Sequence, residues 1–203
     1  MIARRSSLLG LALLLSVRLP ATTVEAPDID SLINQSDYVV RAVVRAATPE
    51  WRQSTDGRRY ISTKVELEIR DVIKGAPPSP LVLDLIGGRI GQDELVLEGM
   101  PQFQVGDEHV LFVHGEQSKM YPLVALMHGV YPVMHEAKSG QDYVLRSNGR
   151  PLYSLQDVAQ PMETAKAARL TNPSARPLTA AAFIAQVRAR AAALTSPAAA
   201  REN

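Results

Sequence analysis

Cysteine is absent from the 203-residue chain. Its absence excludes disulfide bonds, thiolate metal sites, a cysteine nucleophile and a lipidated cysteine behind a signal sequence. Aromatic side chains are also scarce, at 5% of the residues, and they include a single tryptophan, Trp51. The chain is nevertheless long enough to bury one ordinary apolar core without covalent cross-links.

The chain also lacks a strong excess of charge of either sign, with a formal net charge of +1 at pH 7. Residues 27–159 contain 13 basic and 18 acidic residues, whereas residues 160–203 contain 6 basic and 2 acidic ones. Neither part reaches the strongly basic balance of a nucleic-acid-binding protein, so we expect no nucleic-acid partner. A solvated surface followed by an arginine-bearing helix fits this distribution.

A bilayer-length apolar run is missing at the amino end. The run Leu8–Val17 is about half of the ~20 residues that a membrane-spanning helix needs. It follows Arg4 and Arg5, and small residues come after it, as in a cleavable signal peptide. We therefore expect residues 1–26 to be a signal peptide for the general secretory route, with cleavage somewhere between Ala21 and Ala26. The mature protein is then periplasmic or extracellular and has no stable membrane span; an uncleaved membrane anchor is the alternative.

The body of the chain alternates with period two, which predicts strands. Residues 37–46 alternate in this way, and in residues 61–70 five positions face inward: Ile61, Thr63, Val65, Leu67 and Ile69. Ser62 and its even-numbered neighbours then face water. Between these strands, residues 48–59 read as a polar connection with a turn at Asp56-Gly57. A slip of the alternation at residues 71–73 predicts a bulge.

Further short strands are expected at residues 81–86, 94–98, 109–114, 121–127, 130–135 and 143–146. The strand 109–114 is almost wholly apolar between its ends, so we expect it to be buried on both faces. Many short strands separated by glycine and proline turns indicate a barrel or sandwich.

Two helices are expected, a short turn at residues 29–33 and a C-terminal helix. Thr179 is a suitable N-cap for the latter, and its apolar stripe consists of Phe183, Ile184, Val187, Ala191 and Leu194. The resulting order is a β domain over 27–159, a linker over 160–177, a helix over 178–195 and a disordered tail over 196–203.

Four histidines, His109, His114, His128 and His135, are the candidates for metal binding or catalysis. His109 and His114 are separated by five residues, and His128 and His135 by seven. Odd separations place residues of one strand on opposite faces, so neither pair is expected to share a metal. No HExxH, calcium-loop or G-x-S-x-G motif is present. We therefore expect no metal, no cofactor and no enzyme; the alternative is a hydrolase in which a histidine meets a carboxylate or serine.

Two residues are candidates for contact with a partner. Trp51 lies in a polar stretch, and an exposed tryptophan is a common binding anchor, although it can equally cap one end of a barrel. Arg89 lies in the segment Gly87-Gly88-Arg89-Ile90-Gly91. This segment lacks the Lys-Ser/Thr of a phosphate loop and is expected to be a turn between strands, from which Arg89 can reach a partner.

Several segments of the body resemble a known family. Residues 36–44 and 63–69, the latter leading into 72–75, resemble the opening of the OB-fold domain of the tissue inhibitors of metalloproteinases. Residues 99–103 and 105–108, ahead of 110–113, resemble a group of exported bacterial proteins of the same kind. Such proteins often end in a helix similar to residues 178–184.

The resemblance implies a mainly β, OB-like barrel, closed or partly open, with added strands and a C-terminal α-helix. It also suggests an exported metalloprotease as partner. The animal inhibitors reach the protease zinc through an amino-terminal cysteine, which this chain lacks, so that mechanism is not implied. We expect an exported non-catalytic binding module that is a partner or modulator of an exported protease. A third hypothesis is an envelope structural protein whose Arg188 and Arg190 contact anionic surfaces.

Overall fold

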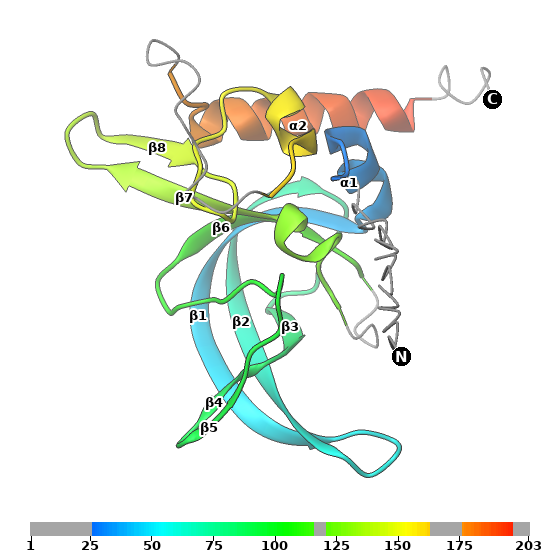
Figure 1. Cartoon of the computed structure of the whole chain (residues 1–203). Coiled ribbons are helices and arrows are strands. Elements are labelled where there is room, and N and C mark those ends of the chain that lie inside the picture. Colours follow the sequence, from blue (N-terminus) through cyan, green and yellow to red (C-terminus); the bar gives the residue numbers. More distant parts are fainter. Residues whose placement is uncertain (1–25, 116–120, 163–175, 197–203) are drawn as a thin grey trace, which may run out of the picture.

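The computed structural model describes residues 26–115, 121–162 and 176–196. Its strands are β1 (Tyr38–Gln53), β2 (Arg59–Lys74), β3 (Leu81–Ile86), β4 (Gly88–Ile90), β5 (Asp93–Leu95), β6 (Glu108–Val113), β7 (Val130–Glu136) and β8 (Gln141–Val144). Its helices are α1 (Ile29–Gln35) and α2 (Ala180–Thr195), with 3-10 turns η1 (Leu126–Gly129) and η2 (Leu155–Ala159). The fold is mainly β with a C-terminal helix, as the sequence predicts (Figure 1).

One antiparallel sheet of six strands, in the order β3-β2-β1-β6-β7-β8, forms the body of the protein, and β4 and β5 form a separate small sheet. Within the described ranges β3 pairs only with β2, so the sheet does not close into a barrel. The edge at β8 is covered, because the amide of Val144 donates to the carbonyl of Leu178 at 3.1 Å.

The prediction of a loop over residues 48–59 is wrong for residues 48–53, because β1 continues to Gln53. These residues pair with the start of β2 in an unbroken register, and the turn is at Gly57, which has φ +86°. Pro49 is tolerated because β6 pairs with β1 only as far as Val43. The far half of β1 is therefore an edge, where a missing N–H loses no ladder bond. Trp51 consequently lies on a strand.

Register shifts bend the β1–β2 hairpin. Ile73 has no partner between the pairs Val39–Lys74 and Val40–Val72, which confirms the bulge predicted at residues 71–73. A second shift lies between Arg41 and Ala42, and a third follows Val44 and reverses the alternation along β1. Because a bulge increases local bending and twist, the hairpin curves away from the rest of the sheet (Figure 1).

Four other local expectations are wrong. Of the strand expected at residues 94–98, only Glu94 and Leu95 belong to β5. Residues 121–127 form a single bridge, Leu123 to Val113, and then η1, where Ala125 and Leu126 adopt left-handed φ values of 50° and 54°. Within the turn expected over residues 87–91, residues 88–90 form strand β4, and the chain turns after it. Ser62 is buried rather than exposed, and its hydroxyl donates to the carbonyl of Leu85 at 3.2 Å. In each case long-range packing overrides the local pattern.

The sheet carries an apolar core on each face. The helix-side core lies under α1 and α2 and includes Val110, Phe112, Tyr131, Phe183 and Val187. The groove-side core lies on the other face and includes Val40, Val65, Leu85, Leu111 and Val113. Alternate residues of β6 enter the two cores, which confirms that this strand is buried on both faces.

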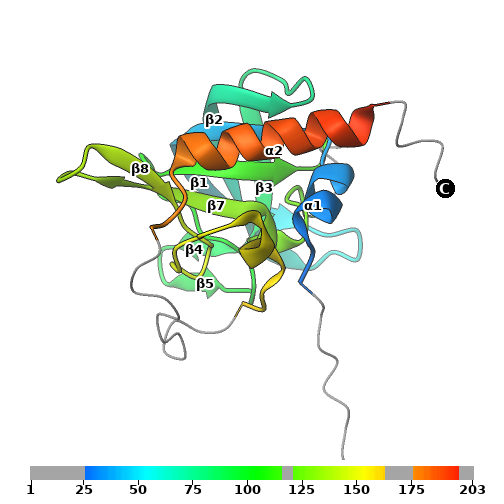
Figure 2. The same cartoon turned by 90° about the horizontal axis from the view of Figure 1, so that it is seen from above.

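The C-terminal helix α2 lies across one face of the sheet (Figure 2). Thr179 is its N-cap and accepts from the amide of Ala182 at 3.1 Å, as predicted. Phe183, Ile184 and Val187 are buried in the helix-side core. The helix thus shares a core with the sheet. None of the described helices is long and apolar enough to cross a membrane.

Candidate functional site

A groove opens on the face of the sheet opposite to α2. Its floor and walls come from β2, β3, the β4–β5 sheet and the segment that follows β5, including Val65, Leu85, Val96, Met100 and Phe103. The volume is about 200 Å³. An apolar cavity of ~150 Å³ holds benzene, whereas sites for drug-sized ligands start at ~300 Å³. The groove therefore has room for one large side chain.

The groove is lined partly by apolar side chains that cover the groove-side core incompletely, and partly by polar side chains that include Thr63, Glu94 and Gln102. Met100 and Phe103 pack against that core from an irregular segment. The ring of Phe103 contacts His109 edge to face, with centroids 5.0 Å apart. Val96, at the rim, is 64% exposed. Sequence reasoning missed these residues, although isolated apolar residues in a turn-rich segment were a signal.

Trp51 lies on β1 near this groove. Its side chain is 40% exposed, and the guanidinium of Arg59 stacks 4.4 Å from its ring centroid. Pro49, two residues before Trp51 on the same face, lies against Gly88 of β4. Strand alternation therefore places Trp51 on the face of the hairpin that β4 covers. Strand β4 and the turn end of the β1–β2 hairpin lie at the end of the molecule away from α1 and α2 (Figure 1).

Arg89 lies at the same end, on β4, and lines the groove. Its guanidinium donates to Glu94 of β5 at 2.7 Å, and both side chains are largely exposed. The glycine before it serves close packing, because a Cβ on Gly88 would lie 2.4 Å from the hydroxyl oxygen of Thr63. The glycine-rich segment thus holds β4 against β2. The structure brings the two predicted contact residues, Trp51 and Arg89, to one end.

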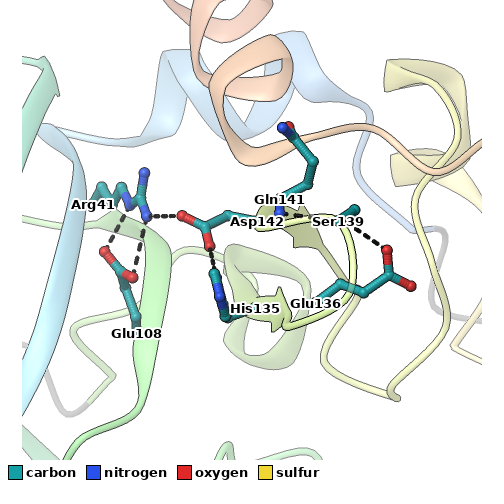
Figure 3. A network of polar contacts seen from close by, with 7 residues as sticks. All are labelled: Arg41, Glu108, His135, Glu136, Ser139, Gln141 and Asp142. Carbon is teal, nitrogen blue, oxygen red and sulfur yellow. Dashed lines mark hydrogen bonds and ion pairs between the residues drawn. The ribbon is translucent and has the colours of Figure 1, made fainter.

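A polar network joins four strands at another surface (Figure 3). Arg41 of β1 donates to Glu108 of β6 at 2.6 Å and to Asp142 of β8 at 2.8 Å. Asp142 also bonds Nδ1 of His135, on β7, at 2.8 Å. The bonds from His135 and then Arg41 lower the pKa of Asp142. The network fastens the β7–β8 hairpin to the centre of the sheet.

His135 is the histidine that meets a carboxylate, as the hydrolase alternative requires. No serine completes the arrangement in the described part of the chain: Ser139, on the neighbouring turn, donates to Glu136 instead, at 2.6 Å (Figure 3). His109 is buried, and neither of its ring nitrogens has a hydrogen-bond partner among the residues that the structure describes. Burial lowers the pKa values of both His109 and His128. Residues 26–115, 121–162 and 176–196 bring no three His, Asp or Glu side chains into a metal-binding group.

The two arginines of α2 are engaged within the chain. Arg188 donates to both carboxylate oxygens of Asp71, at 2.8 and 2.9 Å. Arg190 donates to Asp30 of α1, at 2.6 Å through Nε. Their charges are locally compensated, which disfavours the hypothesis that they bind an anionic surface.

Sequence reasoning also missed a buried cation, Arg146, which is 2% exposed. Its guanidinium donates to the backbone carbonyls of Gln160 and Pro161. Burial lowers its pKa and raises that of Tyr131 nearby. These bonds fasten the chain after η2 to the sheet.

Comparison with known proteins adds no assignment: no family model matches the chain, and no curated protein matches it. The function must be argued from the geometry of the groove.

Proposed function

We propose that the protein is an exported, non-catalytic module that binds another protein through Trp51, Arg89 and the partly apolar groove near them. The observation that carries the proposal is the convergence of Trp51 and Arg89 at one end of the molecule, next to a groove of about 200 Å³. We further propose that the curved sheet is an OB-like, partly open barrel with added strands.

The chemistry of this end suits a protein partner. Tryptophan and arginine are enriched among the residues that dominate binding energy, especially where they adjoin an apolar pocket. The stacked Arg59 restricts the ring of Trp51 before binding, so less side-chain freedom is lost when the partner is bound. Arg89 and Glu94 supply paired charges at the rim, where polar groups contribute to specificity.

An exported metalloprotease is the partner that the sequence resemblance suggests. Without an amino-terminal cysteine the contact cannot copy the zinc-directed inhibition of the animal proteins. Binding through the groove would instead dock the protein on the surface of the protease or of another exported protein.

The test is a binding measurement on purified protein against a panel of exported metalloproteases and of proteins exported by the same cells. For any partner found, Trp51→Ala should weaken binding about thirtyfold, the effect of a hot spot worth roughly 2 kcal/mol. Arg89→Ala should weaken it less, because Arg89 is exposed and already paired.

Tyr121→Ala is the matched control, since Tyr121 is 39% exposed and lies outside the groove lining. It should bind like the wild type. Equal affinity of wild type, Trp51→Ala and Arg89→Ala for an identified partner would show that this end is not the binding surface. Absence of any protein partner would overturn the proposed function.

A further inference from the structure

The edge strand β3 offers a row of backbone hydrogen-bonding groups beside the groove. The amide of Gly87 donates to the carbonyl of Ile61 at 2.9 Å, so these residues form a hydrogen-bonded pair. In an antiparallel ladder such pairs alternate with non-bonded ones. Continuing the register, Leu85 and Leu83 bond to β2. The N–H and C=O groups of Val82, Asp84 and Ile86 therefore point away from the sheet.

These outward groups have no hydrogen-bond partner in the described part of the chain. The other edges of the sheet differ: β8 is covered by residues 178–179, and the free half of β1 contains Pro49, which cannot donate. Unpaired edges promote association unless they are protected. Among residues 26–115, 121–162 and 176–196, the edge of β3 is thus suited to accept another strand.

The groove continues from this edge. Leu85 and Ile86 line it on the β3 side, and Met100 and Phe103 line it on the other. The inward side chains of β3, at Leu81, Leu83 and Leu85, are buried in the groove-side core. A strand added to β3 would direct alternate side chains to the same face. One large apolar side chain of that strand would fill the groove.

We propose that β3 binds an extended segment of the partner protein as an additional antiparallel or parallel strand, with an apolar side chain in the groove. This inference rests on the proposed function and specifies how the partner is recognised. Backbone bonds to Val82, Asp84 and Ile86 supply affinity, and the groove supplies side-chain selectivity, as in other cases of strand addition.

Asp84 determines which occupant fits. If a second copy paired its β3 antiparallel with full overlap, the outward residues would meet as Val82 with Ile86 and Asp84 with Asp84. Like charges directly opposite each other are destabilising. Arg52 offsets the charge of Asp84 only in part, because its Nη2 atom lies 3.3 Å from Asp84 and 2.5 Å from Glu50. A partner segment with a basic residue opposite Asp84 avoids this repulsion, so the occupant is a different protein.

The first experiment selects linear twelve-residue peptides from a random display library on the immobilised protein. Affinities of the selected peptides are then measured for two variants of one position. Asp84→Pro removes an outward N–H while leaving the bonds to β2, since proline is tolerated at such edge positions. Asp84→Ala is the matched control, because it removes the carboxylate and retains the N–H. Asp84→Pro should weaken binding at least tenfold and Asp84→Ala about fivefold or less.

Amide hydrogen exchange of the wild-type protein supplies a readout that needs no variant. Peptide addition should slow exchange at Val82, Asp84 and Ile86, whereas Leu83 and Leu85, already bonded to β2, serve as internal references. Selected peptides that bind without slowing these amides, or that bind Asp84→Pro as tightly as wild type, would overturn the proposal. So would a library that yields no binding peptide.

Two further outcomes separate this inference from its alternatives. Concentration-dependent protection of the same amides without peptide, together with a dimer mass, would assign the edge to a second copy and overturn the proposed occupant. A folded partner that loses affinity for Trp51→Ala but not for Asp84→Pro would leave the binding module standing and refute strand addition. If no folded partner is found but the peptide results hold, strand addition at β3 would stand and the proposed function would be refuted.

Discussion

The two faces of the sheet are covered in different ways. On the helix-side core, α1 and α2 cover the sheet, and Phe112, Tyr131 and Phe183 form a fully buried aromatic cluster with centroid distances of 5.7 and 5.1 Å. On the groove-side core, no helix covers the aliphatic residues in the described part of the chain. Met100 and Phe103 cover them only in part. The comparison indicates that the helix-side core is closed by helices, while the groove-side core stays partly uncovered.

The largest expected effect is a loss of stability of the helix-side core. Phe183→Ala removes a side chain with no exposed surface, and such truncations cost about 3–5 kcal/mol through lost burial and the cavity left behind. Urea unfolding followed by circular dichroism measures the change. Gln186→Ala, at an exposed position of the same helix, is the control and should change the stability by less than ~0.5 kcal/mol. A small effect of Phe183→Ala would show that α2 is not part of the core.

The matching truncation at the groove-side core is Phe103→Ala. Phe103 is only partly buried, so we expect a loss of about 1–2 kcal/mol, below the full burial value of a phenylalanine. Partner binding should be altered at the same time because the groove loses a wall. Gln104→Ala, at the next and exposed position, should leave both properties unchanged. Equal losses of stability for Phe103→Ala and Phe183→Ala would contradict the contrast between the two faces.

His109 packs against Phe103 at the groove-side core, and we expect it to make the free energy of unfolding depend on pH. Burial holds the pKa of His109 below the ordinary value of 6.5, against the opposing pull of Asp107 and Glu108. As the pH falls below 6.5, the unfolded chain therefore binds the proton first and the free energy of unfolding decreases. His109→Leu should make the stability less dependent on pH between 7 and 5, as measured by urea midpoints. His128, shifted in the same direction, should retain part of the slope; an unchanged slope in His109→Leu would contradict the assignment.

The smallest effect on stability is expected from an exposed ion pair between α2 and the sheet. Arg188 and Asp71 tie α2 to β2, but both side chains are more than a third exposed. Exposed pairs of this kind contribute about 0.2–1 kcal/mol. A double-mutant cycle of Arg188→Ala and Asp71→Ala should give a coupling energy in this range that decreases with salt. A coupling above ~2 kcal/mol would mean that the ion pair, rather than the apolar stripe, holds the helix in place.

Local patterns predicted the elements that need no distant information. The inward positions of β2, the N-cap at Thr179 and the stripe from Phe183 to Ala191 follow from period and capping chemistry alone. The prediction failed where pairing partners decide the outcome. Residues 48–53 are polar but extend β1, because the start of β2 lies opposite them. Residues 121–127 are apolar yet irregular, because core burial required no further strand there.

The candidate site was predictable only as isolated residues. Trp51 and Arg89 could be singled out by residue type, but their neighbourhood depends on the bend of the β1–β2 hairpin and on the packing of Gly88 against Thr63. The groove lining at Met100 and Phe103 carried only a weak signal, namely isolated apolar residues in a turn-rich segment. Nor did the sequence indicate that Arg188 and Arg190 would pair with Asp71 and Asp30.

The sequence by itself determined the class of the fold, the positions of most strands and the face that α2 buries, because side-chain periodicity is set within a few residues of the chain. The absence of cysteine likewise excluded disulfides and thiolate sites. Only the tertiary structure decided that β3 would be an edge strand, that the groove would lie beside it and that Trp51 and Arg89 would lie at the same end of the molecule. Those features depend on which strands pair and where the ladder shifts, and such contacts join residues far apart in the chain.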